Sequence, residues 1–156
     1  MSASIRLRMA CEGDRQTVFE WRNDPWIVAL STHQHAIEWA DHLRWFERIL
    51  QSEHHLLFII ESDAGEGMGV IRFDREENDA EVTIYLLQPF TGKGYGVLAL
   101  VEGPARAFSH WPILERVTAT IREDNPNSVK AFTKAGFVEE NRQPGIFLMS
   151  LKRRET

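Results

Sequence analysis

A glycine-rich loop that joins an alternating strand to a helix constrains this sequence more than any other feature. Residues 80–87 alternate between apolar and polar side chains, and the loop Thr91-Gly92-Lys93-Gly94-Tyr95-Gly96 follows and opens into an apolar helix. The first N–H groups of a helix lack intrahelical partners, and the helix dipole adds partial positive charge there. Glycines let such a backbone approach a ligand closely, so the arrangement suits a phosphate or pyrophosphate. The glycines alone fit a plain strand-to-helix turn equally well.

Two common phosphate-binding patterns do not match this loop. The P-loop requires four residues between its glycines and a Lys-Ser/Thr pair after the second. The dinucleotide fingerprint requires a third glycine three residues beyond the second, and after Gly92 and Gly94 that position is Val97. Both nucleotide-binding interpretations therefore fail on spacing.

Length and charge narrow the class of protein. A chain of 156 residues with 43% hydrophobic and 26% charged residues is ordinary for one globular domain, which we expect to span residues 1–156. A net charge of -5 argues against nucleic acid as the main partner. The single cysteine, Cys11, cannot form an internal disulfide, and no apolar run or leader segment indicates a membrane span or secretion. We expect a cytoplasmic protein.

Hydrophobic periodicity predicts a mixed α/β (α+β) chain. Residues 37–52 have the strongest helical pattern, because Trp39, Leu43, Phe46 and Leu50 recur on one face. The other predicted elements are a strand at 5–9, a helix after Asp14, strands at 56–60, 68–73 and 80–87, a helix at 95–110, a strand at 116–121, a helix at 125–135, and strands from Phe137 and Gly145.

Three other segments carry weaker expectations. Residues 26–35 are apolar without a clear period, which fits a loop or a short helix. The charged run at 74–79 reads as a solvated hairpin loop, and Cys11 as a packing residue near a strand end. The predicted order is β-α-α-β-β-β-α-β-α-β-β.

Two motifs in this order resemble the GNAT superfamily of N-acetyltransferases. The glycine loop is similar to its acyl-CoA pattern Arg/Gln-x-x-Gly-x-Gly/Ala, with Thr91 in the leading position. Residues 125–137 resemble its Asn-x-x-Ser/Ala-x-x-x-Tyr-x-Lys-x-Gly-Phe helix. The resemblance implies a central, mostly antiparallel sheet splayed where coenzyme A binds, with acetyl-CoA as cosubstrate and no metal.

The resemblance also implies a set of donor-site residues. Backbone groups at the end of the strand would hold the pantetheine arm, the loop N–H groups would take the pyrophosphate with help from Lys93, and the second helix would contact the coenzyme. Phe132 replaces the family's usual tyrosine and has no proton to give to a leaving thiolate. The implied set is Leu86, Leu87, Gly92, Lys93, Gly94, Tyr95, Gly96, Val97, Asn125, Ser128, Phe132 and Lys134.

Catalysis and metal binding rest on fewer residues. Glu81, on the strand that leads to the loop, is the candidate base, acting directly or through water; the alternative is an ordinary strand glutamate facing solvent. The six histidines form no zinc pattern with the cysteine. His42 borders the apolar face of its helix and is expected to pack there.

The N-terminal half bears on the acceptor. Residues 21–25 and 41–46 resemble two branches of the family, one that acetylates N-termini of ribosomal proteins and one that acetylates a nucleotide-linked amino sugar of the pseudaminic-acid pathway. Arg22 and Asn23 are candidates for holding an anionic acceptor, or else form a polar helix end, and His33 is a candidate pocket residue.

The predicted function is acetyl transfer from acetyl-CoA to a primary amine of a small molecule, most simply a nucleotide-linked amino sugar. The alternatives are a protein N-terminal acetyltransferase and a non-catalytic coenzyme A-binding module, which Thr91 and Phe132 leave open. We expect neither nucleic acid nor a membrane as a partner, and the sequence permits a homodimer without predicting one.

Overall fold

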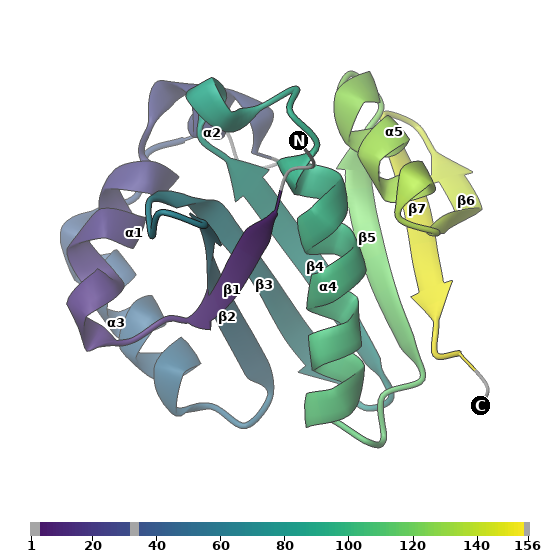
Figure 1. The fold of residues 1–156 in the computed structure, drawn as a ribbon, viewed down its shortest axis with the longest axis horizontal. Coiled ribbons are helices and arrows are strands. Elements are labelled where there is room, and N and C mark those ends of the chain that lie inside the picture. The colour runs from purple at the N-terminus through teal and green to yellow at the C-terminus, as the bar shows by residue number, and fades with distance from the viewer. Residues whose placement is uncertain (1–3, 32–34, 155–156) are drawn as a thin grey trace.

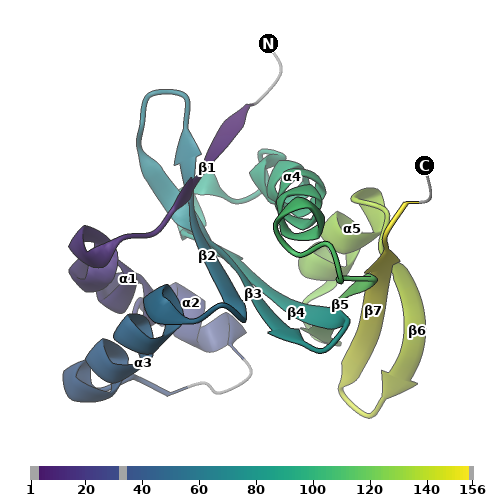
Figure 2. The ribbon, with the colours of Figure 1, turned by 90° about the horizontal axis from the view of Figure 1, so that it is seen from below.

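The computed structural model describes residues 4–31 and 35–154, and within them one sheet of seven strands carries helices on both faces (Figures 1 and 2). The strand order is β1-β2-β3-β4-β5-β7-β6, and only β4 and β5 run parallel. The elements are β1 (Ile5–Met9), α1 (Arg15–Arg22), α2 (Pro25–Leu30), α3 (Trp39–Gln51), β2 (His55–Ser62), β3 (Gly67–Glu76), β4 (Asp79–Leu86), α4 (Tyr95–His110), β5 (Arg116–Arg122), α5 (Pro126–Lys134), β6 (Val138–Gln143) and β7 (Ile146–Lys152).

The two faces of the sheet bury separate apolar clusters. Successive side chains of a strand point to opposite faces, so β3 supplies both clusters. Ile71 and Phe73 lie in the larger cluster beneath α4, while Val70 lies in the smaller one with Val18 of α1 and Phe46 of α3. Figure 2 shows α4 and α5 on one side of the sheet and α1, α2 and α3 on the other.

The parallel pair β4 and β5 separates soon after it begins. The described ladder joins residues 79–81 to residues 116–118 and goes no further. At its base Arg116 and Asp79 also form an ion pair of 2.7 Å. Each strand then leads to a helix, β4 to α4 and β5 to α5, so the N-termini of both helices lie at the end where the strands have parted (Figure 1).

The predicted order of strands and helices is confirmed, with two differences. A third N-terminal helix, α2, occupies part of the segment without a clear period; its six residues are too few to show one. Asp24 caps α2 by accepting a hydrogen bond of 2.8 Å from the Trp26 N–H, with Pro25 in the first helical position. The predicted loop at 74–79 is mostly strand, because β3 and β4 pair until Glu76 faces Asp79.

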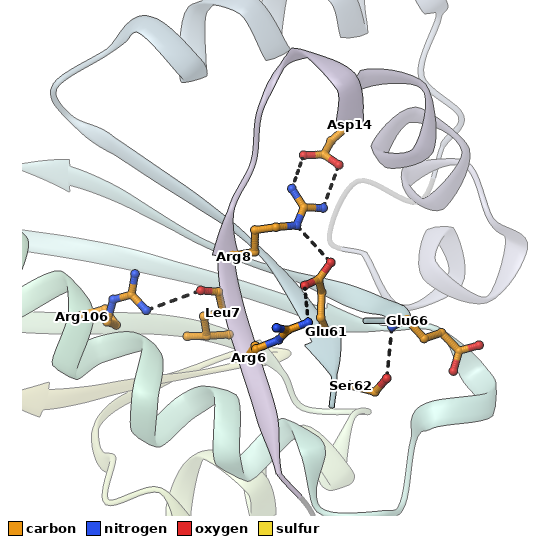
Figure 3. Close-up of polar contacts among 8 residues, drawn as sticks. All are labelled: Arg6, Leu7, Arg8, Asp14, Glu61, Ser62, Glu66 and Arg106. Atoms are coloured by element: carbon orange, nitrogen blue, oxygen red, sulfur yellow. Dashed lines mark hydrogen bonds and ion pairs between the residues drawn. The ribbon is translucent and has the colours of Figure 1, made fainter. Parts of the chain in front are cut away.

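Asp14 does not cap α1 with its side chain, although it stands directly before that helix. Its carboxylate instead accepts two hydrogen bonds of 2.9 Å from Arg8 and one of 2.8 Å from the backbone N–H of Cys11. Arg8 also contacts Glu61 at 3.0 Å, so one guanidinium ties β1 to α1 and β2 (Figure 3). The Cys11 side chain is exposed, so its expected packing role is wrong.

Gly69 of β3 lies opposite Leu86 at the end of β4, where the two backbones leave no room for a side chain. A Cβ atom at this position would lie 2.1 Å from the carbonyl oxygen of Tyr85 and 2.9 Å from the Cα of Leu86. Both are backbone atoms, so no side-chain rotation relieves the clash.

We predict that Gly69→Ala destabilises the protein by about 1–3 kcal/mol, because β4 must move to admit the methyl group. Urea unfolding measures the change. Gly96→Ala is the control, since its Cβ would meet only Leu86 Cδ1 at 3.7 Å and alanine favours a helix. Equal stability of Gly69→Ala and the wild type would contradict the prediction.

Candidate active site

The glycine loop forms an open helix N-terminus. Gly92 and Gly94 have φ angles of 73° and 88°, and a Cβ atom at either position would meet no described atom within 4 Å. The first bond into α4 runs from the Leu98 N–H to the Gly94 carbonyl, so the N–H groups of residues 95–97 have no intrahelical acceptor. With the exposed Lys93 beside them, these groups suit an anion.

The end of β4 presents backbone groups to the gap between β4 and β5. The Leu87 N–H donates to the Met68 carbonyl at 2.9 Å, so Leu87 faces β3. Because backbone groups alternate in direction along a strand, those of Leu86 and Ile84 face the gap. Of the two strand positions expected to hold the pantetheine arm, Leu86 has backbone groups that face the gap, whereas the Leu87 N–H is occupied by β3. Ile84 was missed in the sequence, although an alternation of two from Leu86 indicates it.

The second helix places its motif residues unequally. The side-chain oxygen of Asn125 accepts from the Ser128 N–H at 3.3 Å and caps α5 beside the gap. The Phe132 ring is only 3% exposed and packs edge-to-face on Phe137 at 4.9 Å. Lys134 is exposed in the last turn, which at 1.5 Å per residue lies roughly 12 Å from the start of the helix. Asn125 and Ser128 thus lie at the start of α5, which follows the end of β5, whereas Lys134 lies at the other end of the helix.

Glu81 lies at the last position where β4 pairs with β5, and its side chain is exposed. No hydrogen bond or ion pair among the described residues involves its side chain. Leu86 is five residues further along, about 16 Å at the rise of a strand. A proton would therefore travel between Glu81 and the end of β4 through water.

Arg22 occupies the face of the sheet that α1 and α3 cover. Its guanidinium lies 3.9 Å from the centre of the Trp45 ring, and Arg72 of β3 lies 5.2 Å from the same ring. Burial, and to a lesser extent the positive charge of Arg72, lowers the pKa of Arg22 to about 10. Arg72 was missed in the sequence, since it stands one position from the core residues of an otherwise apolar strand.

Asn23 joins two parts of the backbone. Its side-chain amide donates to the Ile37 carbonyl at 2.9 Å and accepts from the Ile37 N–H at 2.7 Å. These two bonds join the end of α1 to the backbone just before α3, so the Asn23 side chain has a structural role.

Arg122 at the end of β5 donates a hydrogen bond of 2.9 Å to the Ala29 carbonyl and so joins α2 to the end of β5. His33 lies outside the described residues.

His42 is fully buried, as its packing role predicts, among the rings of Phe19, Trp39, Trp45 and Phe46. Its two nitrogens face different groups: Nδ1 lies 3.0 Å from Nη1 of Arg22, and Nε2 lies 2.7 Å from the Arg15 carbonyl oxygen. An arginine only donates and a carbonyl only accepts, so Nδ1 carries no proton and Nε2 carries one. Burial lowers the pKa of His42 below 6.5, and its neutral form orients Arg22.

The His42 pKa predicts a loss of stability in mild acid. The unfolded histidine takes up a proton near pH 6.5, whereas the folded one takes it up only at lower pH. The stability that His42 contributes is therefore complete above pH 6.5 and falls as the pH drops toward the lowered pKa. The loss is about 1.4 kcal/mol for each unit of lowering.

Unfolding free energies measured from pH 7.5 to 5 test this, with His42→Gln as the variant. The variant is expected to be less stable at pH 7.5, and its deficit should shrink as the pH falls. His110→Gln, at an exposed position in the last turn of α4, should follow the wild type. A deficit that stays constant with pH would show that His42 does not supply the pH dependence.

Two negative observations apply to the described part of the chain. It contains no group of three or more His, Cys, Asp or Glu side chains placed to hold a metal ion. None of its helices combines the length and the apolar character that crossing a bilayer requires.

Several solved structures share this fold at low sequence identity. The spermidine N-acetyltransferase of Vibrio cholerae, in complex with CoA and spermine, matches with a TM-score of 0.81 and 16% identity over 95% of both chains. AAC(6')-Ib in complex with ribostamycin and coenzyme A matches with a TM-score of 0.80 and 20% identity over 96% of this chain and 94% of that one. A domain from Methanocaldococcus jannaschii reaches 0.83 at 19% identity over 97% and 100%. No curated protein matches the sequence.

The sheet parts between β4 and β5, and a helix with free N–H groups begins beside the gap, which is the arrangement that the resemblance of the two motifs implies. Residues 4–138 match the family model for the acetyltransferase (GNAT) domain. Because this match covers most of the sequence, the chain belongs to the GNAT acetyltransferase family.

Proposed function

We propose that this protein transfers the acetyl group of acetyl-CoA to a primary amine of a small molecule. The observation that carries the proposal is the parting of β4 and β5 beside two helix N-termini. A strand edge whose backbone groups lack a neighbouring strand can bond an extended amide-containing arm, such as pantetheine. The glycine loop at the end of that edge suits the pyrophosphate. One bound molecule would thus satisfy both features.

Most of the expected donor-site residues have a role in this proposal. The backbone of Leu86, with that of Ile84, holds the pantetheine arm and directs an N–H to the thioester carbonyl. The N–H groups of residues 92–97 and the Lys93 ammonium neutralise the pyrophosphate. Asn125 and Ser128 border the coenzyme from the cap of α5.

The chemistry requires a neutral amine next to the thioester. Its nitrogen attacks the carbonyl carbon, the C–S bond breaks, and the surplus amine proton passes through water to Glu81. Phe132 cannot protonate the departing sulfur, and its ring is buried. A thiol has a pKa of about 8.5, so the thiolate is a stable enough leaving group without a positioned acid.

The proposal that the acceptor is a small amine is supported by the family and by the names of the structural neighbours. The neighbours are named for acetylation of spermidine and of aminoglycosides, which are small amines. A nucleotide-linked amino sugar is the narrower proposal, supported by the sequence at residues 21–25 and 41–46. Protein N-termini are the second candidate, because the same segments resemble that branch as well.

The test of the function measures coenzyme A release from acetyl-CoA with amino sugars, polyamines, aminoglycosides and peptides as acceptors. We expect acceptor-dependent release with at least one small amine. Coenzyme A binding without release for any amine would instead support a non-catalytic module. Gly94→Ala should raise the KM for acetyl-CoA at least 10-fold (about 1.4 kcal/mol), because a left-handed loop residue and close approach are both disturbed.

Gly145→Ala is the matched control for Gly94→Ala. Gly145 also has a positive φ, 83°, and open space around it, but it lies in the turn between β6 and β7. The control imposes similar backbone strain away from the loop, so its KM should equal that of the wild type. Equal KM values for both variants would remove the glycine loop from the donor site.

The role of Glu81 predicts a change in the pH profile of the reaction. Glu81→Gln should lower kcat/KM about 100-fold near neutral pH, within the range for a general base. The deficit in kcat/KM should shrink at high pH. There the amine is already unprotonated, and hydroxide can take up the proton that is released on attack. Glu76→Gln, an exposed strand position, is the control. A full rate for Glu81→Gln across the pH range would show that Glu81 is an ordinary surface residue.

A further inference from the structure

A partly buried positive charge on the α3 face of the sheet has no carboxylate partner. Among the described residues, the polar contact of the Arg22 guanidinium is with the neutral His42 ring, and its flat face lies on Trp45. Nearby Arg72 does have a partner, since its Nε donates to Asp74 at 3.1 Å. Asp74 also contacts His55 at 2.6 Å, and no ion pair joins Arg22 to a carboxylate among the described residues.

A buried hydroxyl group near Arg22 also lacks a hydrogen-bond acceptor. The oxygen of Tyr85 is buried and has no hydrogen-bond partner among the described groups. Its charged neighbours are Arg22 and Arg72, and both are donors only. A buried hydroxyl without a partner is rare in folded proteins, and one beside two guanidinium groups lacks an acceptor in particular.

The location links these groups to the proposed reaction. Tyr85 directly precedes Leu86, whose backbone faces the gap between β4 and β5. Arg72 faces Thr83 in the neighbouring strand, with 3.4 Å between Nη2 and Oγ1. The positive cluster of Arg22, Arg72 and Tyr85 therefore lies within about three strand residues of the end of β4, on the face opposite α4.

We infer that this positive cluster binds an oxyanion carried by the acceptor, so that the substrate is an amine with a carboxylate or phosphate group. The inference rests on the proposed function and specifies its substrate class. An oxyanion would neutralise Arg22 and accept hydrogen bonds from its guanidinium N–H groups. After a small movement of the Tyr85 side chain, it would also accept a hydrogen bond from the Tyr85 hydroxyl. Polyamines and unmodified aminoglycosides are positively charged and have no anionic group, so the cluster disfavours them by repulsion.

The first experiment measures anion binding without any turnover. Thermal unfolding is followed with inorganic phosphate replacing chloride at constant ionic strength and with saturating coenzyme A, which covers the start of α4. We expect the midpoint of the wild type to rise with phosphate and that of Arg22→Met to stay unchanged. Arg44→Met is the control, since Arg44 is exposed on α3 and paired with Asp41. It should respond as the wild type does.

The second experiment compares acceptors that differ only in an anionic group. The pairs are glucosamine 6-phosphate with glucosamine, and an amino acid with its amide, so that phosphate and carboxylate are distinguished. We expect kcat/KM to be at least about 10-fold higher for the anionic member of one pair, the usual effect of a bond to a charged group. Arg22→Met should abolish this preference, Arg22→Lys should keep part of it, and Arg44→Met should keep all of it.

The outcomes separate this inference from the proposed function. Acetylation of both members of each pair at equal kcat/KM, or a preference for spermidine, would overturn the anion site while leaving the acetyltransferase intact. Phosphate stabilisation lost in Arg22→Met, with no acetylation of any amine, would support the site and refute the function. If Arg22→Met does not fold, Arg72→Met and Arg22→Lys give the same comparison, and an unchanged preference in both overturns the inference.

Discussion

The short pairing between β4 and β5 is the constraint on which the site depends. These strands are held together at their start by three paired positions and by the ion pair between Asp79 and Arg116. Beyond Glu81 and Thr118 each strand follows its other neighbour, β4 with β3 and β5 with β7. The backbone of Ile84 and Leu86 therefore faces a gap rather than a strand. Backbone N–H and C=O groups need partners, which makes this edge a binding surface for an extended amide chain.

In the proposed reaction, one face of the sheet binds the coenzyme and the other face binds the acceptor. The side with α4 and α5 has glycines and free N–H groups for the coenzyme, and its core beneath α4 is apolar. The side with α1 and α3 holds Arg22, Arg72 and Tyr85 around Trp45. Placing a partly buried guanidinium there without a carboxylate has a desolvation cost. The cation–π contact with Trp45 and the bond to neutral His42 offset part of that cost.

Family motifs and structural roles overlap at particular residues. Asn125 was predicted to contact the coenzyme, and its side-chain oxygen caps α5, so the motif residue builds the helix start at the gap. Asn23 stands next to Arg22 in the sequence, yet its amide holds the Ile37 backbone. Phe132 lies in the core against Phe137. For residues of this kind, a sequence pattern identifies a position but cannot separate a structural bond from a ligand contact.

The sequence alone determined most of the order of the elements and the glycine loop that opens α4, because these depend on local periodicity and on glycine conformation. The short helix α2 was not predicted, because its six residues are too few to show a helical period. The tertiary structure decided which distant groups meet: Arg22 of α1 with Arg72 of β3 and Tyr85 of β4, and the parting of β4 from β5. Those contacts depend on strand pairing and register, which join residues far apart in the chain and have no local signal.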